Sequence, residues 1–420
     1  VLIMGSYLSQ PVTEKETEEG ELYDYLIFGA CAMQGWRRSM EDEHIAIALN
    51  PPQNNQNLKV SMFGVWDGHG GKEVARYVRR YMHLELMKLD EYQNGDIEKA
   101  LIRVFHRIDE MLWDQANHQE VLALKTDEKP SNALPSSNNS TTNDNSTGGN
   151  VPSLAASSSS SSSSRLAAAT PFKEDDEDDD GEGINTNELL DIFKTLMASR
   201  GNQPKNQEGA TSDSEAASSN TQTPPPLTRN SCNLPAVPIT AGCTSVVALL
   251  LDRLLYVANA GDSRGVLCRQ GKAVALSEDH KPSQEREIQR ISKAGGFITE
   301  AGRINGNLNL SRSIGDLKYK QSKELPVAEQ MITAEPDVTV FNIDPATDEF
   351  MILACDGIWD CFTNEVAVDF VRSRLAMGMT PVEVSKAACD ECLAEDPKAS
   401  QGIGGDNMTC LVVVFKAQGV

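Results

Sequence analysis

The sequence lacks basic residues relative to acidic ones. It holds 38 Lys and Arg against 61 Asp and Glu among 420 residues, so its formal net charge is −23. A field of that sign opposes binding to a phosphate backbone, so nucleic acid is not expected as a direct ligand. Basic proteins suit this charge better as partners.

Long apolar runs and clustered metal-binding thiols are also missing. No run reaches the roughly 18 apolar residues of a membrane span. The nine cysteines, an odd number, include one C-x-x-C at Cys389 and Cys392, with no second Cys or His pair near it in sequence to complete a zinc site. We expect two half-buried thiols on a helix there. No secretory signal is recognised, which favours a reducing compartment.

Residues 125–234 have too little apolar side-chain area to fold. Ser, Asn, Thr, Pro and acids dominate them, with a serine run at 157–164 and the acidic block EDDEDDD at 174–180. Such a composition cannot offset the entropy of ordering the backbone, which predicts a disordered acidic insertion. The chain then divides into an N-terminal extension (1–24), a first core part (25–124), the insertion (125–234) and a second core part (235–420).

The N-terminal stretch MGSYLS, from Met4 to Ser9, fits the pattern for N-myristoylation. Three residues precede Met4, so Gly5 is acylated only if Met4 is the natural start. One acyl chain would give weak, reversible membrane attachment.

Short apolar runs and turns indicate antiparallel sheets. TSVVALLL and LLYVANA are separated only by Asp252 and Arg253, which predicts a tight hairpin. Further strands are expected at 44–49, 60–66, 338–343, 349–355 and 408–415. Helices are expected after Gly71, after Asp96, and over 284–294, 363–377 and the stretch from Thr380. The simplest arrangement is two packed sheets with helices outside.

Carboxylates recur at the ends of these strands. Glu41 and Asp42 begin a strand, Asp67 and Asp356 each end one, and Asp406 begins the last. If the strands are neighbours, the carboxylates gather at one rim and repel each other unless cations neutralise them. The donors are carboxylates and turn carbonyls without clustered Cys or His, which favours magnesium or manganese.

The stretch VWDGHGG is by itself an ordinary strand end and turn. Beside Asp67, however, Gly68 lets a backbone carbonyl approach a metal. Gly357 and Gly405 are expected to allow sharp turns next to Asp356 and Asp406.

Seven motifs in order carry a resemblance: GWRRSMED, VWDGHGG, TSVVALL, ANAGDSR, LNLSRSIGD, CDGIWD and GGDNMT. They resemble the metal-dependent serine/threonine protein phosphatases, the PPM or type-2C family, over nearly everything outside the insertion. The resemblance implies an α+β fold, in which a central antiparallel β-sandwich is flanked by helices on both faces. It also implies Mg²⁺- or Mn²⁺-dependent hydrolysis of phosphoserine and phosphothreonine in proteins.

The resemblance assigns a metal role to five residues. Asp67 would bridge two Mg²⁺ or Mn²⁺ ions and Gly68 would contribute its carbonyl. Glu41 would complete the shell of one ion, and Asp356 and Asp406 that of the other. The two ions would then generate a bridging hydroxide that attacks phosphorus directly.

Two further residues are assigned to the chemistry itself. By resemblance, Arg37 would hold the phosphate and His69 would protonate the leaving oxygen as general acid. Each also has an interpretation without a catalytic role: Arg37 and Arg38 could be a solvated basic pair, and His69 could be a structural turn residue.

Outer positions complete the expected site. Asp42 would hold metal-bound water. Asp262 and Asp360 would help to bind a weaker third metal, or are turn and helix-start residues. Asn407 and Thr244 would be outer-shell or structural. The segment from His280 to the RSIGD motif resembles the family's flap, where substrate selectivity would arise.

More narrowly, MGSYLSQP, CAMQGW and the acidic insertion are similar to the gamma isoform within the family. This implies basic substrates such as histones or splicing factors recruited by the insertion, and a location in cytoplasm and nucleus with partial membrane association. A monomer is expected. The main alternative is a pseudophosphatase scaffold that binds basic proteins through the insertion; a phosphodiesterase or nuclease is disfavoured by the charge and the motifs.

Overall fold

The computed structural model describes residues 7–126 and 238–416. Gly5 of the acylation pattern and nearly all of the predicted insertion, including the acidic block at 174–180, lie outside the described residues. No helix in the described part of the chain is long and apolar enough to cross a membrane.

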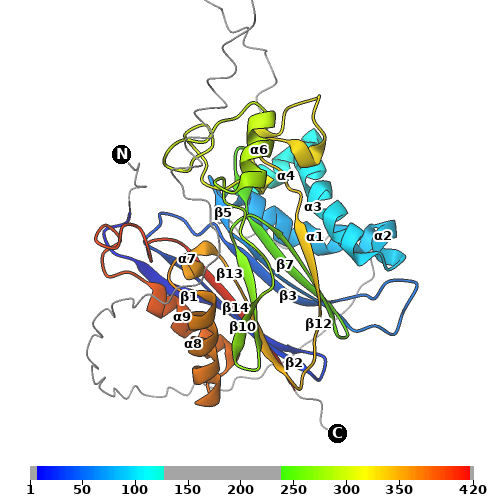
Figure 1. Cartoon of the computed structure of the whole chain (residues 1–420), viewed down its shortest axis with the longest axis vertical. Helices are drawn as coiled ribbons and strands as arrows, with labels where there is room; N and C mark the ends of the chain where they lie inside the picture. Colours follow the sequence, from blue (N-terminus) through cyan, green and yellow to red (C-terminus); the bar gives the residue numbers. More distant parts are fainter. Residues whose placement is uncertain (1–6, 127–237, 417–420) are drawn as a thin grey trace, which may run out of the picture. The chain divides into compact units, whose positions relative to one another are not determined.

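Two antiparallel sheets pack face to face at the centre of the fold (Figure 1). The first has the order β1 (Val12–Leu22), β2 (Leu26–Gly35), β14 (Met408–Phe415), β13 (Asp348–Ala354), β9 (Arg264–Arg269) and β10 (Lys272–Ala275). The second has the order β12 (Asp337–Asn342), β8 (Leu254–Ala260), β7 (Ser245–Leu251), β4 (Val60–Trp66) and β3 (Glu43–Leu49). A short third sheet joins β11 (Ile314–Gly315), β6 (Gly242–Cys243) and β5 (Gly68–His69).

Helices cover the outer face of each large sheet. The helices in the described residues are α1 (Glu73–Lys88), α2 (Asp90–Gln93), α3 (Ile97–Trp113), α4 (His118–Ala123), α6 (Glu285–Lys293), α7 (Asp356–Trp359), α8 (Asn364–Ala376) and α9 (Pro381–Cys392). Helices α1 and α3 pack on the second sheet, and α8 and α9 on the first. Three apolar layers therefore hold the fold together, one between the sheets and one under each helical layer.

This layering explains the continuous apolar runs in the sequence. Strands β4 and β7 are buried at every position, because one face meets the other sheet and the opposite face meets helices. Burial on both faces removes the usual alternation of apolar and polar residues. The expected sandwich with helices on both faces is confirmed.

Local signals were also confirmed. The hairpin around Asp252 and Arg253 joins β7 to β8. Thr380 caps α9 through a capping box with Glu383. The expectation of half-buried thiols on this helix was wrong, because Cys389 and Cys392 are 0% and 5% exposed.

The sequence patterns did not predict β1, an edge strand with a mostly exposed, glutamate-rich sequence. Residues 12–22, which we assigned to an N-terminal extension, pair along β2 and belong to the first sheet. Charged side chains on an edge strand oppose pairing with another chain.

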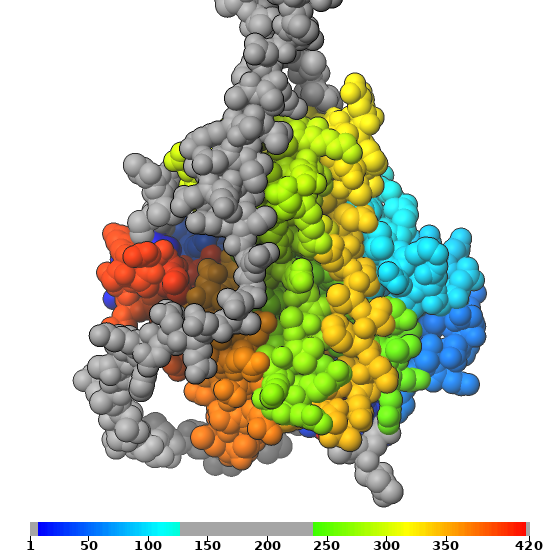
Figure 2. All heavy atoms as spheres, viewed as in Figure 1, coloured from blue at the N-terminus to red at the C-terminus, as the bar shows by residue number. Residues whose placement is uncertain are grey.

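The segment after β10 forms a separate small unit around α6 with its own apolar cluster of Ile291, Ile304 and Ile332. Figure 2 shows the later residues of this segment, in yellow, lying against the cyan helices. The ion pairs Lys320–Asp109 and His106–Glu335 join it to α3. We call residues 280–335 the flap.

A buried ion cluster holds the flap together. Glu287, on α6, is fully buried, and its carboxylate accepts hydrogen bonds from Arg312 at 2.8 and 3.1 Å and from Arg290 at 2.5 Å. Although burial alone would raise the pKa of Glu287, the hydrogen bonds and charges of the two arginines outweigh it and lower that pKa to about 2. The ionised form is therefore strongly favoured in the folded state.

Because the folded pKa of Glu287 lies below the unfolded value of 4.5, its stabilisation is present above about pH 4.5 and is lost as the pH falls towards 2. We expect Glu287→Gln to reduce the free energy of unfolding at neutral pH by about 3 kcal/mol, at about 1.4 kcal/mol per pKa unit. The difference from wild type should shrink in acid. Urea unfolding at a series of pH values measures it.

Glu329→Gln is the matched control, because Glu329 lies on the same flap but its ion pair with Lys293 is exposed. An exposed pair contributes at most about 1 kcal/mol. A destabilisation by Glu287→Gln that stays constant from neutral pH to about pH 3 would contradict the assignment.

Candidate metal centre and active site

The antiparallel register places the carboxylates at one end of the sandwich. Glu43 of β3 lies opposite Trp66 of β4, so Glu41 precedes one strand where Asp67 follows the other. Ala354 of β13 lies opposite Cys410 of β14, which brings Asp356 and Asp406 to a common end.

Asp262 reaches the same end from β8. Ser245 of β7 lies opposite Ala260, and β7 also pairs with β4. Thr244 fixes this junction, since its N–H donates to the carbonyl of Asp67 at 2.9 Å and its hydroxyl lies 2.7 Å from that of Ser263. This gives Thr244 the structural role that was one of its two expected roles.

Glu41 and Gly68 are in direct backbone contact. A Cβ atom on Gly68 would lie 2.2 Å from the Glu41 carbonyl oxygen, so only glycine permits this approach. The Glu41 carboxylate accepts hydrogen bonds from Ser39 at 2.7 Å and from the N–H of Gly71 at 3.0 Å. Glu41 is thereby held beside the turn that follows Asp67.

Asn407 fastens this segment to β14. Its side-chain oxygen accepts from the Glu41 N–H at 3.0 Å, while its amide nitrogen donates to the carbonyls of Gln34 and Ser39 at 2.8 and 3.0 Å. The amide is thus used as a clamp between the two strand ends. It therefore positions the Glu41 backbone, while its outer-shell role stays a prediction.

The carboxylates of Asp67 and Asp356 have no hydrogen bond or ion pair within residues 7–126 and 238–416. Withdrawal from water is the main cause that raises the pKa of both well above the usual value. Repulsion adds to it: Asp356 acts most strongly on Asp67, and Asp262 on Asp356. Two recessed carboxylates without partners are the group that bound cations would neutralise.

Asp42 lies behind this pair and is 6% exposed. One of its oxygens accepts from the Thr409 hydroxyl at 2.7 Å, and the other is buried without a partner in the described residues. Burial, with a smaller contribution from Asp406, raises its pKa to about 7. An orphaned buried oxygen fits the predicted task of accepting from a water molecule.

Basic side chains partly neutralise the outer carboxylates. Arg37 forms an ion pair with Asp406, and Lys281 lies 2.6 Å from the buried Asp262. Within the described ranges no three His, Cys, Asp or Glu side chains already stand close enough to coordinate one ion. Asp67 and Asp356 keep the acidic, oxygen-only character that suits Mg²⁺ or Mn²⁺.

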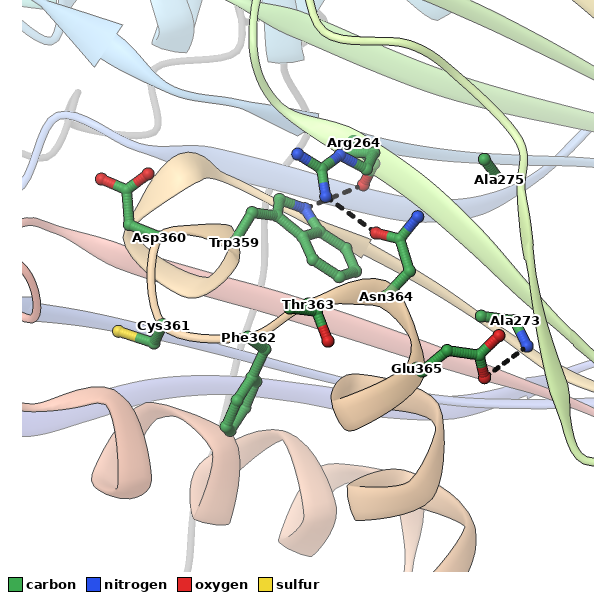
Figure 3. A pocket seen from close by; sticks show the side chains of 10 residues that line it. All are labelled: Arg264, Ala273, Ala275, Trp359, Asp360, Cys361, Phe362, Thr363, Asn364 and Glu365. Carbon is green, nitrogen blue, oxygen red and sulfur yellow. Dashed lines mark hydrogen bonds between the residues drawn. The ribbon is translucent and has the colours of Figure 1, made fainter. Parts of the chain in front are cut away.

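Asp360 stands at the outer edge of the site. It is exposed at the end of α7, beside an open cleft of about 680 Å³ that Arg264 and Trp359 also line (Figure 3). Although the residue is exposed, partial withdrawal of its carboxylate from water, only partly offset by Lys281, raises its pKa. Its predicted third-metal role stays a prediction, as does that of Asp262.

His69 has a partner that the sequence patterns did not reveal. Its Nε2 lies 2.5 Å from the buried Asp316 carboxylate, which also accepts from the Ser313 hydroxyl at 2.8 Å. Burial opposes the charged imidazolium, but Asp316 outweighs it and raises the pKa of His69. The protonated form is the one that a general acid requires.

The short third sheet creates this pair. Gly242 of β6 lies opposite both His69 and Gly315, so it stands between the two motifs. A Cβ atom on Gly242 would lie 2.3 Å from the Asp316 carboxylate and 2.7 Å from Nε2 of His69. The motif LNLSRSIGD contained Asp316, but only the two-residue strands bring it to His69.

Comparisons with known proteins agree on one family. The family model for protein phosphatase 2C matches residues 27–127 and 186–400. Probable protein phosphatase 2C 21 of Arabidopsis thaliana is 38% identical over 414 residues, covering 98% of this chain and 93% of that protein. Probable protein phosphatase 2C 11 of Oryza sativa subsp. japonica is 37% identical, covering 98% and 91%.

A solved phosphatase from Toxoplasma gondii shares the fold, with a TM-score of 0.53 at 19% identity over 97% of each chain. None of these three matches names an isoform, so the gamma resemblance stays a prediction.

The partnerless carboxylates predict an unusual stability effect. Because Asp67→Asn removes one of several mutually repelling charges, we expect the metal-free variant to be more stable than metal-free wild type, on the order of 1 kcal/mol. The variant should also lose most of the rise in melting temperature that Mn²⁺ gives wild type. Thermal unfolding with and without Mn²⁺ measures both.

Asp369→Asn is the control, because Asp369 is exposed on α8. It should change neither the metal-free melting temperature nor the response to Mn²⁺. A metal response of Asp67→Asn equal to that of wild type would contradict a metal role for this carboxylate.

Proposed function

This chain belongs to the protein phosphatase 2C family and is a protein serine/threonine phosphatase, and on that premise we propose that the carboxylate-lined end of its sandwich is where phosphoserine and phosphothreonine are hydrolysed. Proteins of this family depend in general on Mg²⁺ or Mn²⁺. The observation that carries the proposal is the recessed pair Asp67 and Asp356, whose carboxylates have no partner in the described residues, near a histidine whose pKa Asp316 raises.

Five residues would hold two divalent cations. Glu41, Asp67 and the carbonyl of Gly68 would bind one ion, and Asp67, Asp356 and Asp406 the other. When bound, such ions lower the pKa of water and supply the nucleophile.

Arg37 stands where a substrate phosphate would enter. Its side chain is 51% exposed while it pairs with Asp406. With a cation on Asp406, the planar guanidinium could exchange this partner for two oxygens of the phosphate. Arg37 would then orient the phosphorus and balance charge in the transition state.

His69 would deliver the proton to the leaving oxygen. Asp316 holds the ring at Nε2 and favours the imidazolium, while Nδ1 has no partner in the described residues. The Nδ1 proton is therefore the one available for transfer. Asp316 is a positioning residue, since it acts on the substrate only through His69.

The test compares two leaving groups in the presence of Mn²⁺. Serine and threonine alkoxides need a proton to leave, whereas a nitrophenolate does not. We expect His69→Gln to lower kcat on a phosphothreonine peptide about 100-fold and on an aryl phosphate less than about threefold. Asp316→Asn should also lower kcat more on the peptide than on the aryl phosphate, with a loss of about 10-fold on the peptide.

Asp369→Asn again serves as the unaffected control, and Asp67→Asn should lose turnover of both substrates. Equal losses on both substrates for His69→Gln would argue against an acid role. No turnover by folded wild type at any Mn²⁺ or Mg²⁺ concentration would favour the scaffold function instead.

We also propose that the acidic insertion recruits basic phosphoproteins. The block EDDEDDD at 174–180 carries seven of the chain's acidic residues in one run. A dense negative charge raises the encounter rate with a positive partner, and salt weakens this effect. The catalytic end of the sandwich would be unchanged by its removal.

Replacing residues 174–180 by serine should lower kcat/KM on a basic phosphoprotein roughly tenfold at low salt. Turnover of the aryl phosphate should not change. Kinetics at low and high salt measure this, with the serine run at 157–164 replaced by alanine as control. An equal loss on both substrates would contradict recruitment.

A further inference from the structure

A pair of thiols lies directly behind the metal-binding end of the first sheet. Cys361 follows α7 and is half-buried. It lines the open cleft beside Asp360 (Figure 3). Cys392 is the last residue of α9 and is 5% exposed. Cys361 Sγ lies 3.5 Å from the Cys392 carbonyl oxygen, and the two sulfurs contact the carbonyls of consecutive residues, Gly357 at 3.6 Å from Cys361 and Ile358 at 4.0 Å from Cys392. The sulfurs are thus neighbours from different elements.

The contacts of Cys361 lead towards two predicted metal ligands. Its thiol donates to the carbonyl of Gly357 at 3.6 Å, next to Asp356. The Cys392 carbonyl that this thiol also contacts packs directly on Gly404, where a Cβ atom would lie 2.2 Å from the carbonyl oxygen. Gly404 is two residues before Asp406, so a displacement of this sulfur affects the backbone on both sides of the site.

The loop at Gly404 has little freedom to absorb such a displacement. The Gly404 carbonyl accepts from the Ala394 N–H at 3.0 Å, and the Ala394 carbonyl accepts from Trp36 at 2.9 Å. Trp36 directly precedes Arg37. The sulfur pair, the Asp406 loop and the arginine segment therefore form one connected wall.

We propose that Cys361 and Cys392 form a reversible disulfide on exposure to a peroxide, and that this disulfide lowers catalytic activity. The crosslink does not depend on the proposed function, whereas its effect on turnover does. Access favours Cys361 as the first thiol to react, and contact makes Cys392 the resolving thiol.

The reaction is balanced with one peroxide. The Cys361 sulfur attacks one peroxide oxygen, and the O–O bond breaks. The other peroxide oxygen takes up the thiol proton and leaves as water, so that Cys361 becomes a sulfenic acid. Cys392 sulfur then attacks the sulfenic sulfur, the S–S bond forms, the S–O bond breaks, and a second water leaves. Two thiols lose two electrons in total.

The disulfide changes the connected wall beside Asp406 in two ways. It draws the sulfurs from non-bonded contact to about 2.05 Å, and it removes the S–H donor that the Gly357 and Cys392 carbonyls now share. We expect turnover to fall roughly tenfold or more, because a 1 Å displacement near a reacting centre can cost about 100-fold.

A second thiol pair supplies the matched control. Cys389 Sγ likewise lies 3.9 Å from the carbonyl oxygen of its partner Cys31, but both residues are 0% exposed. A peroxide cannot reach them without local unfolding. Oxidation should therefore crosslink Cys361 with Cys392 and leave Cys31 and Cys389 reduced, although the contacts of the two pairs are alike.

The experiment exposes the reduced full chain to hydrogen peroxide, quenches with catalase, alkylates the remaining thiols and maps crosslinked peptides by mass spectrometry. Turnover of the phosphothreonine peptide with Mg²⁺ is measured before oxidation, after it, and after reduction by dithiothreitol. Cys361→Ser, Cys392→Ser and the control Cys389→Ser are treated identically, with melting temperatures confirming that each reduced variant is folded.

The proposal predicts a Cys361–Cys392 crosslink in wild type and in Cys389→Ser, with a loss of turnover that dithiothreitol restores. Cys361→Ser and Cys392→Ser should keep their turnover in peroxide. Absence of the crosslink, full turnover of crosslinked protein, or equal inhibition of Cys361→Ser would each overturn it. A reduced protein without turnover that still crosslinks would overturn the proposed function and support the crosslink alone.

Discussion

Repulsion among carboxylates at one end of an antiparallel sandwich is the constraint on which the rest of the site depends. The register makes it unavoidable, since β3, β4, β13 and β14 each have an acidic residue within two positions of the strand end that lies there. The surrounding contacts then follow as responses to it. Lys281 and Arg37 neutralise the outer acids and Asn407 fixes the backbone of Glu41, whereas the central pair, Asp67 and Asp356, has no such partner among the described residues.

The sequence predicted the layers and most strands, because burial on both faces leaves continuous apolar runs. It failed for β1, whose exposed edge position leaves no such run. The candidate site was predictable where strand ends carried acids. The partnership of His69 with Asp316 was not, because it depends on strands of two residues that have no periodicity to detect. The same limit applies to Gly68, where the contact with the Glu41 backbone comes from tertiary packing rather than from the turn.

The C-x-x-C on α9 shows why spacing alone misleads. Residues three apart lie on one face of a helix, which suggested a pair of equivalent thiols. In the fold the two have different partners: the Cys389 thiol contacts the carbonyl of Cys31 on β2, and the Cys392 carbonyl contacts the thiol of Cys361 after α7. The helix thus connects a sealed thiol pair with an accessible one. The thiol pair that can react is the one whose second cysteine is accessible. Cys361 is half-buried, whereas Cys31 is buried.

The buried carboxylate of the flap is paired with arginines, whereas the central carboxylates of the site are not. Glu287 is satisfied by Arg290 and Arg312, so its charge needs no bound cation. Among the described residues Asp67 and Asp356 lack such partners, so the folded chain retains unfavourable repulsion that bound cations would relieve. Metal binding would therefore contribute directly to folding free energy at the catalytic end. A change at Glu287 alters the flap without removing a charge from the site, whereas Lys281 and Asp316, which also belong to the flap, contact Asp262 and His69 directly.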